Sequence, residues 1–538
     1  MKKYILAFVF ALLGPMDLVL GQVNFTHRVE VATEWVDNNF IILPSENGTV
    51  AFRSVSSKGF NISKKLQYFT TDRHLKASKL MEFPLKDHFD LIGFDLDGGW
   101  LYLLLQKGDA YSGDKLIYGI NLETQQLIEV EAENILDMEI REFLVMDEKA
   151  ILMGMMEYRP AIQVFDLKNK NVYTVQGIYS NEVNILQIRK DPELKFFDVL
   201  VNRRDRFKRK TVSVLTFDER GNKLREVKIE PRKDPQLEIE EGLLTPVQDY
   251  IQALIGPFGL RKREPNKGIY FSRINEFGEY KNRFYTLTDF ENFYNYLPEK
   301  QKARRERSLE KAIRKEKSIT IPNSLVTREV ISKGGNFLVY NDYFMASTSR
   351  FRQRDVIYHN DFYRYYPDGF RNQVNLGGYT WYNSRSREGV NYQYKYLAAQ
   401  FLLLDQQGNM IWDNTLSLQD LITANPGKFG EVSFDGDNLF YMYLEEDKLN
   451  LTHLFGGEVK FENQEFELEL LAKNERIKET QVESLSLMWW YDHYFLLSGK
   501  QQIRFQGEDA RERVREVFFI TKIKVDGQLD RALTQEEN

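Results

Sequence analysis

The chain has 538 residues, of which 42% are hydrophobic, 28% are charged and 14% are aromatic, and none is cysteine. The apolar and aromatic content excludes a disordered or fibrous protein, and the lack of cysteine excludes a disulfide scaffold, a thiolate zinc site, an iron–sulfur cluster and a cysteine nucleophile. The 73 basic and 79 acidic residues give a formal net charge of −6, so we expect no nucleic-acid partner, because nucleic-acid-binding proteins are usually basic.

The N-terminus has the layout of a secretory signal peptide. Two lysines precede an apolar run at residues 4–13, and small residues lead up to Gly21. This order predicts a signal peptide at residues 1–21 that is cleaved after Gly21. The alternative, a membrane anchor, needs about 20 uninterrupted apolar residues, and this run is interrupted by Pro15 and Asp17.

Export without cysteine predicts the compartment. An exported eukaryotic chain of this size would usually contain disulfides, so we expect a bacterial protein that is periplasmic or extracellular. No segment after Gly21 approaches 18 consecutive apolar residues, so we expect no membrane span in the mature chain.

Short strands with period-two alternation dominate residues 22–538. Residues 116–122, 212–217 and 517–525 are examples, each rich in β-branched or aromatic residues and followed by a polar turn. Eight such turns recur at intervals of roughly 45–65 residues, except for one long interval that begins near residue 275. This rhythm predicts an all-β fold, with residues 22–538 forming a β-propeller of about 7–8 four-stranded blades. A pair of β-sandwiches is the alternative.

The long interval predicts a small helical insertion at about residues 288–318. Thr288 and Glu291 have the spacing of a capping box, and residues 299–317 contain nine basic and four acidic residues with a narrow apolar stripe. These charges fit either a solvated helix face or a contact with nucleic acid or an anionic surface. Capping and apolar spacing predict shorter helices at two further places, residues 245–255 and 417–424.

No sequence pattern predicts a metal or cofactor site. The six histidines lack the spacing of local metal ligands, and the acidic turns at residues 95–99 and 435–438 do not complete a calcium loop. We therefore expect no metal and no cofactor, and the catalytic residues of any activity stay unknown. His359 and Asp361 fit either a base with its orienting acid or an ordinary surface segment.

Aromatic residues concentrate close to the predicted insertion. Residues 337–396, which we expect to include a long loop, contain 17 aromatic residues interleaved with arginines. Tyr, Trp and Arg side chains form adhesive surfaces for protein partners, and flat rings suit stacking on sugars. The candidate binding residues are Arg364, Tyr365, Tyr366, Trp381 and Tyr382. The alternative is that many rings of this region fill the space between blades.

The turn at residues 404–412 resembles the end of a blade in quinoprotein-type propellers. It has Asp405 and Gly408 within the turn and Trp412 after it. Together with the strand rhythm, this turn makes the chain similar to secreted bacterial β-propeller proteins. The other predicted units lack the Trp, so the resemblance implies a fold and does not imply the quinoprotein cofactor.

Two hypotheses for the function follow. The first, which we favour, is an exported non-enzymatic propeller that binds a protein, a glycan or another cell-surface partner through the insertion and the aromatic-rich region. The second is a carbohydrate-active hydrolase or lyase with its site in the axial channel. The enzyme should bring carboxylates or a histidine together beside aromatic rings in an axial pocket, with a glycosidase pair about 5–10 Å apart.

Overall fold

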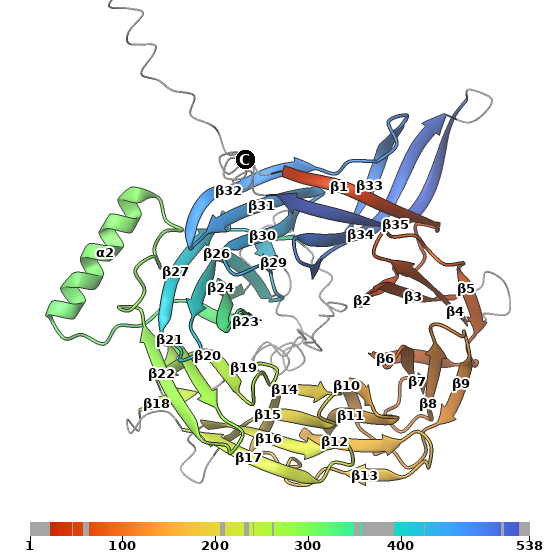
Figure 1. The fold of residues 1–538 in the computed structure, drawn as a ribbon, viewed down its shortest axis with the longest axis horizontal. Helices are drawn as coiled ribbons and strands as arrows, with labels where there is room; N and C mark the ends of the chain where they lie inside the picture. Colours follow the sequence, from red (N-terminus) through yellow and green to blue (C-terminus); the bar gives the residue numbers. More distant parts are fainter. Residues whose placement is uncertain are drawn as a thin grey trace, which may run out of the picture.

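The chain folds as a β-propeller of eight blades arranged in a ring (Figure 1). The computed structural model describes residues 22–45, 47–56, 64–204, 210–230, 236–239, 241–260, 263–348, 356–357, 392–423, 426–506 and 511–526. The main strands of each blade run antiparallel to their neighbours and are arranged from the axis outward, and one short parallel pair, residues 356–357 with 422–423, is added to the sixth blade. The predicted all-β propeller with about 7–8 four-stranded blades is therefore confirmed.

Blades 1 to 4 each consist of four strands that are consecutive in the sequence. Blade 1 has β2 (Ile41–Ser45), β3 (Gly48–Ser56), β4 (Lys64–Asp72) and β5 (Met81–Pro84), and blade 2 has β6 (Phe89–Asp97), β7 (Trp100–Lys107), β8 (Lys115–Asn121) and β9 (Leu127–Glu131). Blade 3 has β10 (Glu139–Met146), β11 (Lys149–Met156), β12 (Arg159–Asp166) and β13 (Val172–Thr174), and blade 4 has β14 (Val183–Asp191), β15 (Phe196–Arg204), β16 (Lys210–Asp218) and β17 (Lys223–Ile229).

Blades 5 and 6 carry additional short strands, and blade 8 contains both ends of the described chain. Blade 5 has β18 (Leu237–Ile239), β19 (Leu243–Leu244), β20 (Gln252–Leu260), β21 (Arg263–Ile274) and β22 (Tyr280–Thr286). Blade 6 has β23 (Ser324–Lys333), β24 (Asn336–Thr348), β25 (Val356–Ile357), β26 (Tyr392–Leu404), β27 (Met410–Ser417) and β28 (Ile422–Thr423). Blade 7 has β29 (Glu431–Phe434), β30 (Asn438–Glu445), β31 (Lys448–Phe455) and β32 (Glu458–Glu467), and blade 8 has β33 (Glu475–Tyr491), β34 (Tyr494–Gln506), β35 (Glu512–Asp526) and β1 (Gln22–Ala32).

The hydrophobic core is divided among the junctions between blades. Within the described residues, every pair of neighbouring blades shares one cluster of buried apolar side chains. The second and third strands of a blade are therefore apolar on both faces. In β7, for example, all five residues from Leu101 to Leu105 are buried. Alternate residues of such a strand point toward the two neighbouring blades.

The ring closes by pairing of the first described strand with the last. β1 runs antiparallel to β35, from Gln22 opposite Asp526 to Ala32 opposite Val517. Blade 8 thus takes three strands from the end of the chain and its outermost strand from the beginning. Separating β1 from β35 would expose a sheet edge and open the ring.

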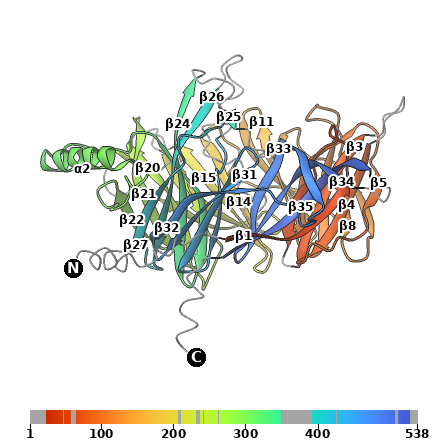
Figure 2. The same ribbon diagram turned by 90° about the horizontal axis from the view of Figure 1, so that it is seen from above.

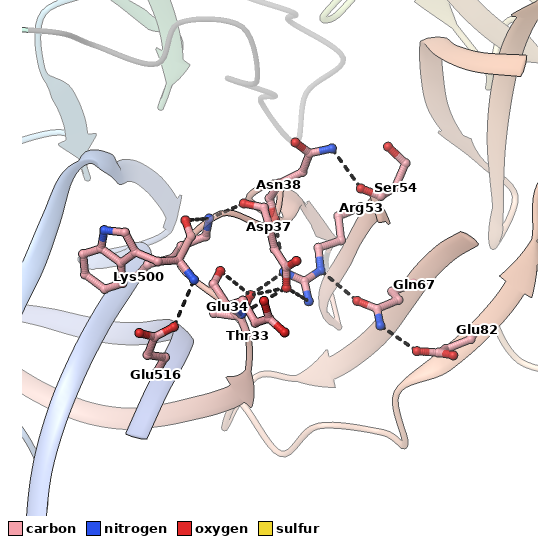
Figure 3. A network of polar contacts seen from close by, with 11 residues as sticks. Thr33, Glu34, Asp37, Asn38, Arg53, Ser54, Gln67, Glu82, Lys500 and Glu516 are labelled. Carbon is pink, nitrogen blue, oxygen red and sulfur yellow. Dashed lines mark hydrogen bonds and ion pairs between the residues drawn. The ribbon is translucent and has the colours of Figure 1, made fainter. Parts of the chain in front are cut away.

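A polar network fixes the connection from β1 to blade 1 (Figure 3). Arg53 of β3 donates to Thr33 Oγ1 at 2.6 Å and to the Asn38 carbonyl at 3.1 Å. Lys500 of β34 donates to the carbonyls of Trp35, at 3.2 Å, and Asp37. Cations of blades 1 and 8 therefore both bind the connecting segment, and burial lowers the pKa of Arg53 and of Lys500.

Two histidines meet on the opposite side of the same closure. The rings of His27 in β1 and His74 in blade 1 have centroids 5.2 Å apart. Lys522 of β35 lies close by and donates to the Arg73 carbonyl at 2.9 Å. The pKa of His27 is lowered first by burial and then by the charges of Lys522 and His74, whereas Asp72 acts in the opposite direction.

The lowered pKa of His27 makes the closure sensitive to acid. The unfolded chain binds a proton at this residue near pH 6.5, above the folded pKa, so stability is full above that pH and falls as the pH drops below it. When the pH is lowered from about 7.5 to about 5.5, we expect the melting temperature of His27→Gln to fall less than that of the parent. His88→Asn, at an exposed position, serves as the control and should keep the parental pH dependence. Equal pH dependence of all three proteins would contradict this account.

A buried lysine links three blades near their innermost strands. Lys190 of β14 donates to Asp95 Oδ2 of β6 at 2.7 Å and to the Val145 carbonyl of β10 at 2.8 Å. Asp95 also accepts from the Val145 amide at 2.6 Å. Asp95 is 0% exposed and Lys190 is 6% exposed, so the Asp95 carboxylate depends on Lys190 for compensation, and Lys190 also lies 3.7 Å from Asp97 Oδ1.

We expect Lys190→Met to lower the free energy of unfolding by about 3–5 kcal/mol, because it leaves the Asp95 carboxylate buried without its cation. The double variant Lys190→Met with Asp95→Leu should recover part of this loss, because it removes both charges. Lys195→Met is the matched control, since Lys195 forms an exposed pair with Asp147 at 3.1 Å and should change stability by less than about 1 kcal/mol. Urea unfolding measures all three, and equal losses for Lys190→Met and Lys195→Met would contradict the prediction.

One helix, α2 (Glu299–Arg314), lies among the described residues, and it leaves the ring between blades 5 and 6 (Figure 1). Residues 288–297 form turns instead, with the Asp289 carboxylate accepting from the Thr286 amide at 2.7 Å. The shorter helices predicted at residues 245–255 and 417–424 are wrong, because strand pairing overrides their local helical pattern. Ile255 pairs with Leu243, and residues 422–423 form β28. Among the described residues, no helix is both long and apolar enough to cross a membrane.

Candidate functional site

The candidate binding residues from the sequence, namely Arg364, Tyr365, Tyr366, Trp381 and Tyr382, lie outside the described residues, as do His359 and Asp361. The structure describes the strands that flank them, β24 and β26. The buried rings of these strands are Phe337, Tyr340, Tyr343, Phe344, Tyr396 and Phe401. In the flanking strands the aromatic residues therefore mostly fill the space between blades. For these strands this agrees with the alternative to a binding surface.

Two departures from the regular blade pattern occur at neighbouring places. The connection from β22 to β23 contains α2, and β24 and β26 are 13-residue strands that run past the rest of their blade (Figure 2). Connections between blades and connections between the second and third strands emerge on the same face of a propeller, because neighbouring strands alternate in direction. The helix and the ends of these two strands thus belong to one face of the ring.

The base of the insertion is fixed to blade 6. Asp413 of β27 accepts hydrogen bonds from the amides of Glu291 at 3.0 Å and Asn292 at 2.9 Å. Phe290 and Phe293 are buried in the cluster between blades 5 and 6. These contacts fix the segment that leads into α2 against blade 6.

Helix α2 itself contributes little to the core. None of its 16 residues is buried, and Leu309 packs at the margin of the cluster between blades 5 and 6. Lys302 donates to Asn295 Oδ1 at 2.8 Å, so this side of the helix faces the insertion base. Glu299 in the first turn and Arg314 in the last complement the helix dipole.

The opposite side of α2 carries a cationic stripe, which we define as Lys300, Arg304, Arg307, Lys311 and Arg314. Spacings of four and three residues place these side chains along one side of a helix, and the 3.6-residue repeat places that side opposite Leu309. All five are exposed. Within the described chain, the ion pair recorded for the stripe joins Arg314 to Glu310 at 3.6 Å. The basic residues of this helix are evident in the sequence as a count, and the helix places five of them on one side.

The innermost strands of blades 6 and 7 contain buried charges of both signs. Lys428 Nζ lies 2.7 Å from Glu329 Oε2 of β23 and 3.0 Å from Glu431 Oε2 of β29. These two carboxylate oxygens can be no farther apart than the sum of those distances, which limits their separation to the short end of the range for a glycosidase pair. However, Glu431 is only 1% exposed, and both carboxylates share a lysine. The arrangement compensates charge and does not present a proton to a substrate.

Next to this group, Arg328 and Asp342 form a fully buried ion pair at 2.6 Å. Arg328 is the additional residue at a β-bulge in β23, a device that redirects a side chain. Tyr340 donates to Asp342 Oδ1 at 2.5 Å. Burial raises the pKa of Asp342 and of Tyr340, and the group joins β23 to its neighbouring strand.

A serine, a histidine and an aspartate meet between blades 7 and 8, a constellation that the sequence did not predict. His493 Nδ1 lies 3.0 Å from Ser433 Oγ, and His493 Nε2 lies 3.2 Å from Asp435 Oδ2. Ser433 is 0% exposed and donates to the Asp492 carbonyl, so its hydroxyl is not available as a nucleophile. The contacts instead connect the β33–β34 turn to blade 7.

The acidic turns considered for calcium have structural roles. Asp435 accepts hydrogen bonds from the amides of Asp437 at 3.0 Å and Asn438 at 2.7 Å, and Asp95 pairs with Lys190. Among the described residues, no three acidic or histidine side chains gather in a geometry that could bind a metal ion.

A small hollow lies at the junction of blades 8 and 1. Its lining combines apolar and small polar side chains, namely Asn39, Phe40, Ile42, Ser484, Ser486, Met488 and Ser498. It contains no acid or base and adjoins the network of Figure 3. Its composition suits ordered water more than a reaction site.

Comparison with protein-family models found no match, and comparison with curated proteins found none either. Among solved structures, the chain is similar to the β-propeller domain of the Trilobed protease from Pyrococcus furiosus, at 10% identity and a TM-score of 0.33, over 80% of this chain and 96% of that one. It is similar to a prolyl endopeptidase at 10% identity and a TM-score of 0.38, over 82% of this chain and 50% of that one, so it spans about half of that protein's length. It is also similar to a polysaccharide lyase, at 9% identity and a TM-score of 0.37, over 93% and 100% of the two chains.

Removing the lysine shared by the two inner carboxylates should produce a pH-dependent loss of stability. In Lys428→Gln, Glu329 and Glu431 would lie close together in a buried place, so their pKa values in the folded state should rise above those of the unfolded chain. The loss should therefore be small near pH 5 and larger near pH 8, where both carboxylates must ionise.

The matched control for this variant is Lys448→Gln, because Lys448 is shared by Glu465 at 2.7 Å and Glu467 at 3.3 Å on the exposed outer strand of blade 7. Thermal melting at the two pH values measures both variants, and the control should change little. A loss in Lys428→Gln that is the same at both pH values would show that charge compensation is not the role of Lys428.

Proposed function

We propose that this chain is an exported binding module that attaches to a protein or cell-surface partner through the outward side of α2 and the adjoining ends of β24 and β26. The observation that carries the proposal is the cationic stripe on a helix that buries none of its residues. The stability of the propeller does not require these charges, because the helix adds little to the core. A helix fixed at its base and free along its outer side is suited to contact another molecule.

Location outside the cytoplasm is part of the proposal. The predicted signal peptide ends at Gly21, and β1 begins at Gln22. Cleavage there would leave every described strand of the propeller intact. The lack of cysteine means that packing and strand pairing supply the stability of the exported chain without disulfides.

The second candidate function is a carbohydrate-active hydrolase or lyase in the axial channel. It is favoured by the closeness of Glu329 and Glu431 to Lys428, whose Nζ lies 5.9 Å from the centroid of the Tyr340 ring. The burial of Glu431 weighs against it, because a general acid or nucleophile must reach its substrate.

Site-specific crosslinking can distinguish the two, because a chain without cysteine can receive one label at a chosen place. Ser308→Cys puts the label beside the cationic stripe, and Ser112→Cys puts it on an exposed turn of blade 2. Asn184→Cys puts it on an exposed position of β14, an innermost strand. Each protein carries a photocrosslinker and is incubated with envelope material of the source organism.

We expect a discrete macromolecular adduct from position 308 and none from position 112. Adducts from position 184 alone, together with release of sugar from polysaccharides, would replace the binding proposal with the enzymatic one. Equal crosslinking from positions 308 and 112 would contradict a contact surface at α2.

A further inference from the structure

We infer that the partner of the cationic stripe on α2 is a linear anionic polysaccharide, one that carries carboxylate or sulfate groups along its length. This inference rests on the proposed function, because it assigns a chemical class to the ligand of the same surface. It is argued from the shape of the stripe, the chemistry of its side chains and the lack of apolar residues around it.

The stripe is long and narrow. A helix rises about 1.5 Å per residue, so consecutive members are separated by about 4.5 or 6 Å along the axis, and the stripe from Lys300 to Arg314 extends about 21 Å. A small anion could contact only one or two of these charges. An extended polymer with regularly repeated charges can contact all of them at once.

The side chains suit carboxylate and sulfate groups. Three of the five are arginines, whose planar guanidinium group donates two parallel hydrogen bonds to such an anion, and two are lysines, which add compact charge. Most of their charge is available for a ligand, since the recorded ion pair within the described chain involves Arg314.

The surroundings favour a hydrophilic polymer over a folded protein or a membrane. Protein interfaces depend on apolar and aromatic anchors at their centre, and the stripe contains none. A membrane-bound amphipathic helix inserts apolar side chains into the lipid, whereas Leu309 of α2 packs toward the propeller and Ile313, which is 50% exposed, lies on that same side of the helix. A sugar chain needs neither feature.

The charge of the whole chain confines binding to this place. The formal net charge is −6, although residues 299–317 contain nine basic and four acidic residues. The remainder of the chain is therefore more acidic than the net charge alone indicates, and apart from a second basic stretch at residues 203–210 it should disfavour a polyanion. An anionic polymer should be directed to α2.

The test compares two triple variants of residues 22–538 that remove the same charge. The stripe variant carries Arg304→Gln, Arg307→Gln and Lys311→Gln, and the control carries the exposed substitutions Lys76→Gln, Lys168→Gln and Lys473→Gln on other blades. Binding to polygalacturonate, dextran sulfate and neutral dextran is measured by calorimetry over a range of salt concentrations. Circular dichroism confirms that both variants are folded.

We expect the parent and the control to bind polygalacturonate or dextran sulfate and not to bind dextran. The stripe variant should bind the same anionic polymers with an affinity that is lower by at least about tenfold. The dependence of log affinity on log salt should flatten in the stripe variant by about three fifths, because three of five cations are lost. Oligomers shorter than the stripe should bind more weakly than the polymer, which is the signature of a linear site.

Equal weakening in the stripe variant and the control would overturn the inference, because it would indicate unspecific charge. So would binding to anionic lipid vesicles or to single-stranded DNA that is as tight as binding to the polysaccharides. If polysaccharides do not bind but position 308 still crosslinks to a protein, the inference fails and the proposed function stands. If neither occurs, both are wrong.

Discussion

The structure depends on closing a ring of blades that are apolar on both faces. Residues such as Leu101 to Leu105 bury alternate side chains toward the two neighbouring blades. A blade therefore cannot bury its apolar faces without a neighbour on each side, and an open end of the ring would expose one such face to water. The pairing of β1 with β35 removes that open end. The polar contacts of Arg53 and Lys500 add to it by fixing the segment that leads from β1 into blade 1.

This constraint also separates the charges that the ring needs from those that we propose to bind a partner. Ionic groups at the innermost strands are bound to partners on other blades, as Lys190 is to Asp95 and Lys428 is to Glu329. Such groups compensate one another in a place with little water, and their removal should affect stability first. The charges of α2 lie on a helix that the ring does not need. The account of function therefore depends on the insertion, and the ring acts as its rigid support.

The sequence predicts the fold because the blade pattern is local. Period-two alternation and polar turns repeat in every blade, and a run of helix formers marks α2. The wrong helix predictions arise where contacts with residues far away in the chain determine the local structure. The capping pattern at Thr245 is overridden when Leu243 pairs with Ile255, and the one at Thr288 is overridden when Asp413, more than a hundred residues away in the chain, accepts the amides of Glu291 and Asn292. The cluster around Lys428 combines the nearby Glu431 with Glu329, which belongs to another blade and which no local pattern connects to Lys428. The cationic stripe, in contrast, was accessible from the four-and-three spacing of its residues.

The central claim, that the outer side of α2 is the contact surface, is tested most directly by hydrogen–deuterium exchange of the mature chain with and without polygalacturonate. The account predicts slower exchange confined to peptides covering residues 299–314, with the innermost strands β23, β29 and β33 unchanged. Protection of those innermost strands with no change in α2 would place the ligand in the axial channel and contradict the claim.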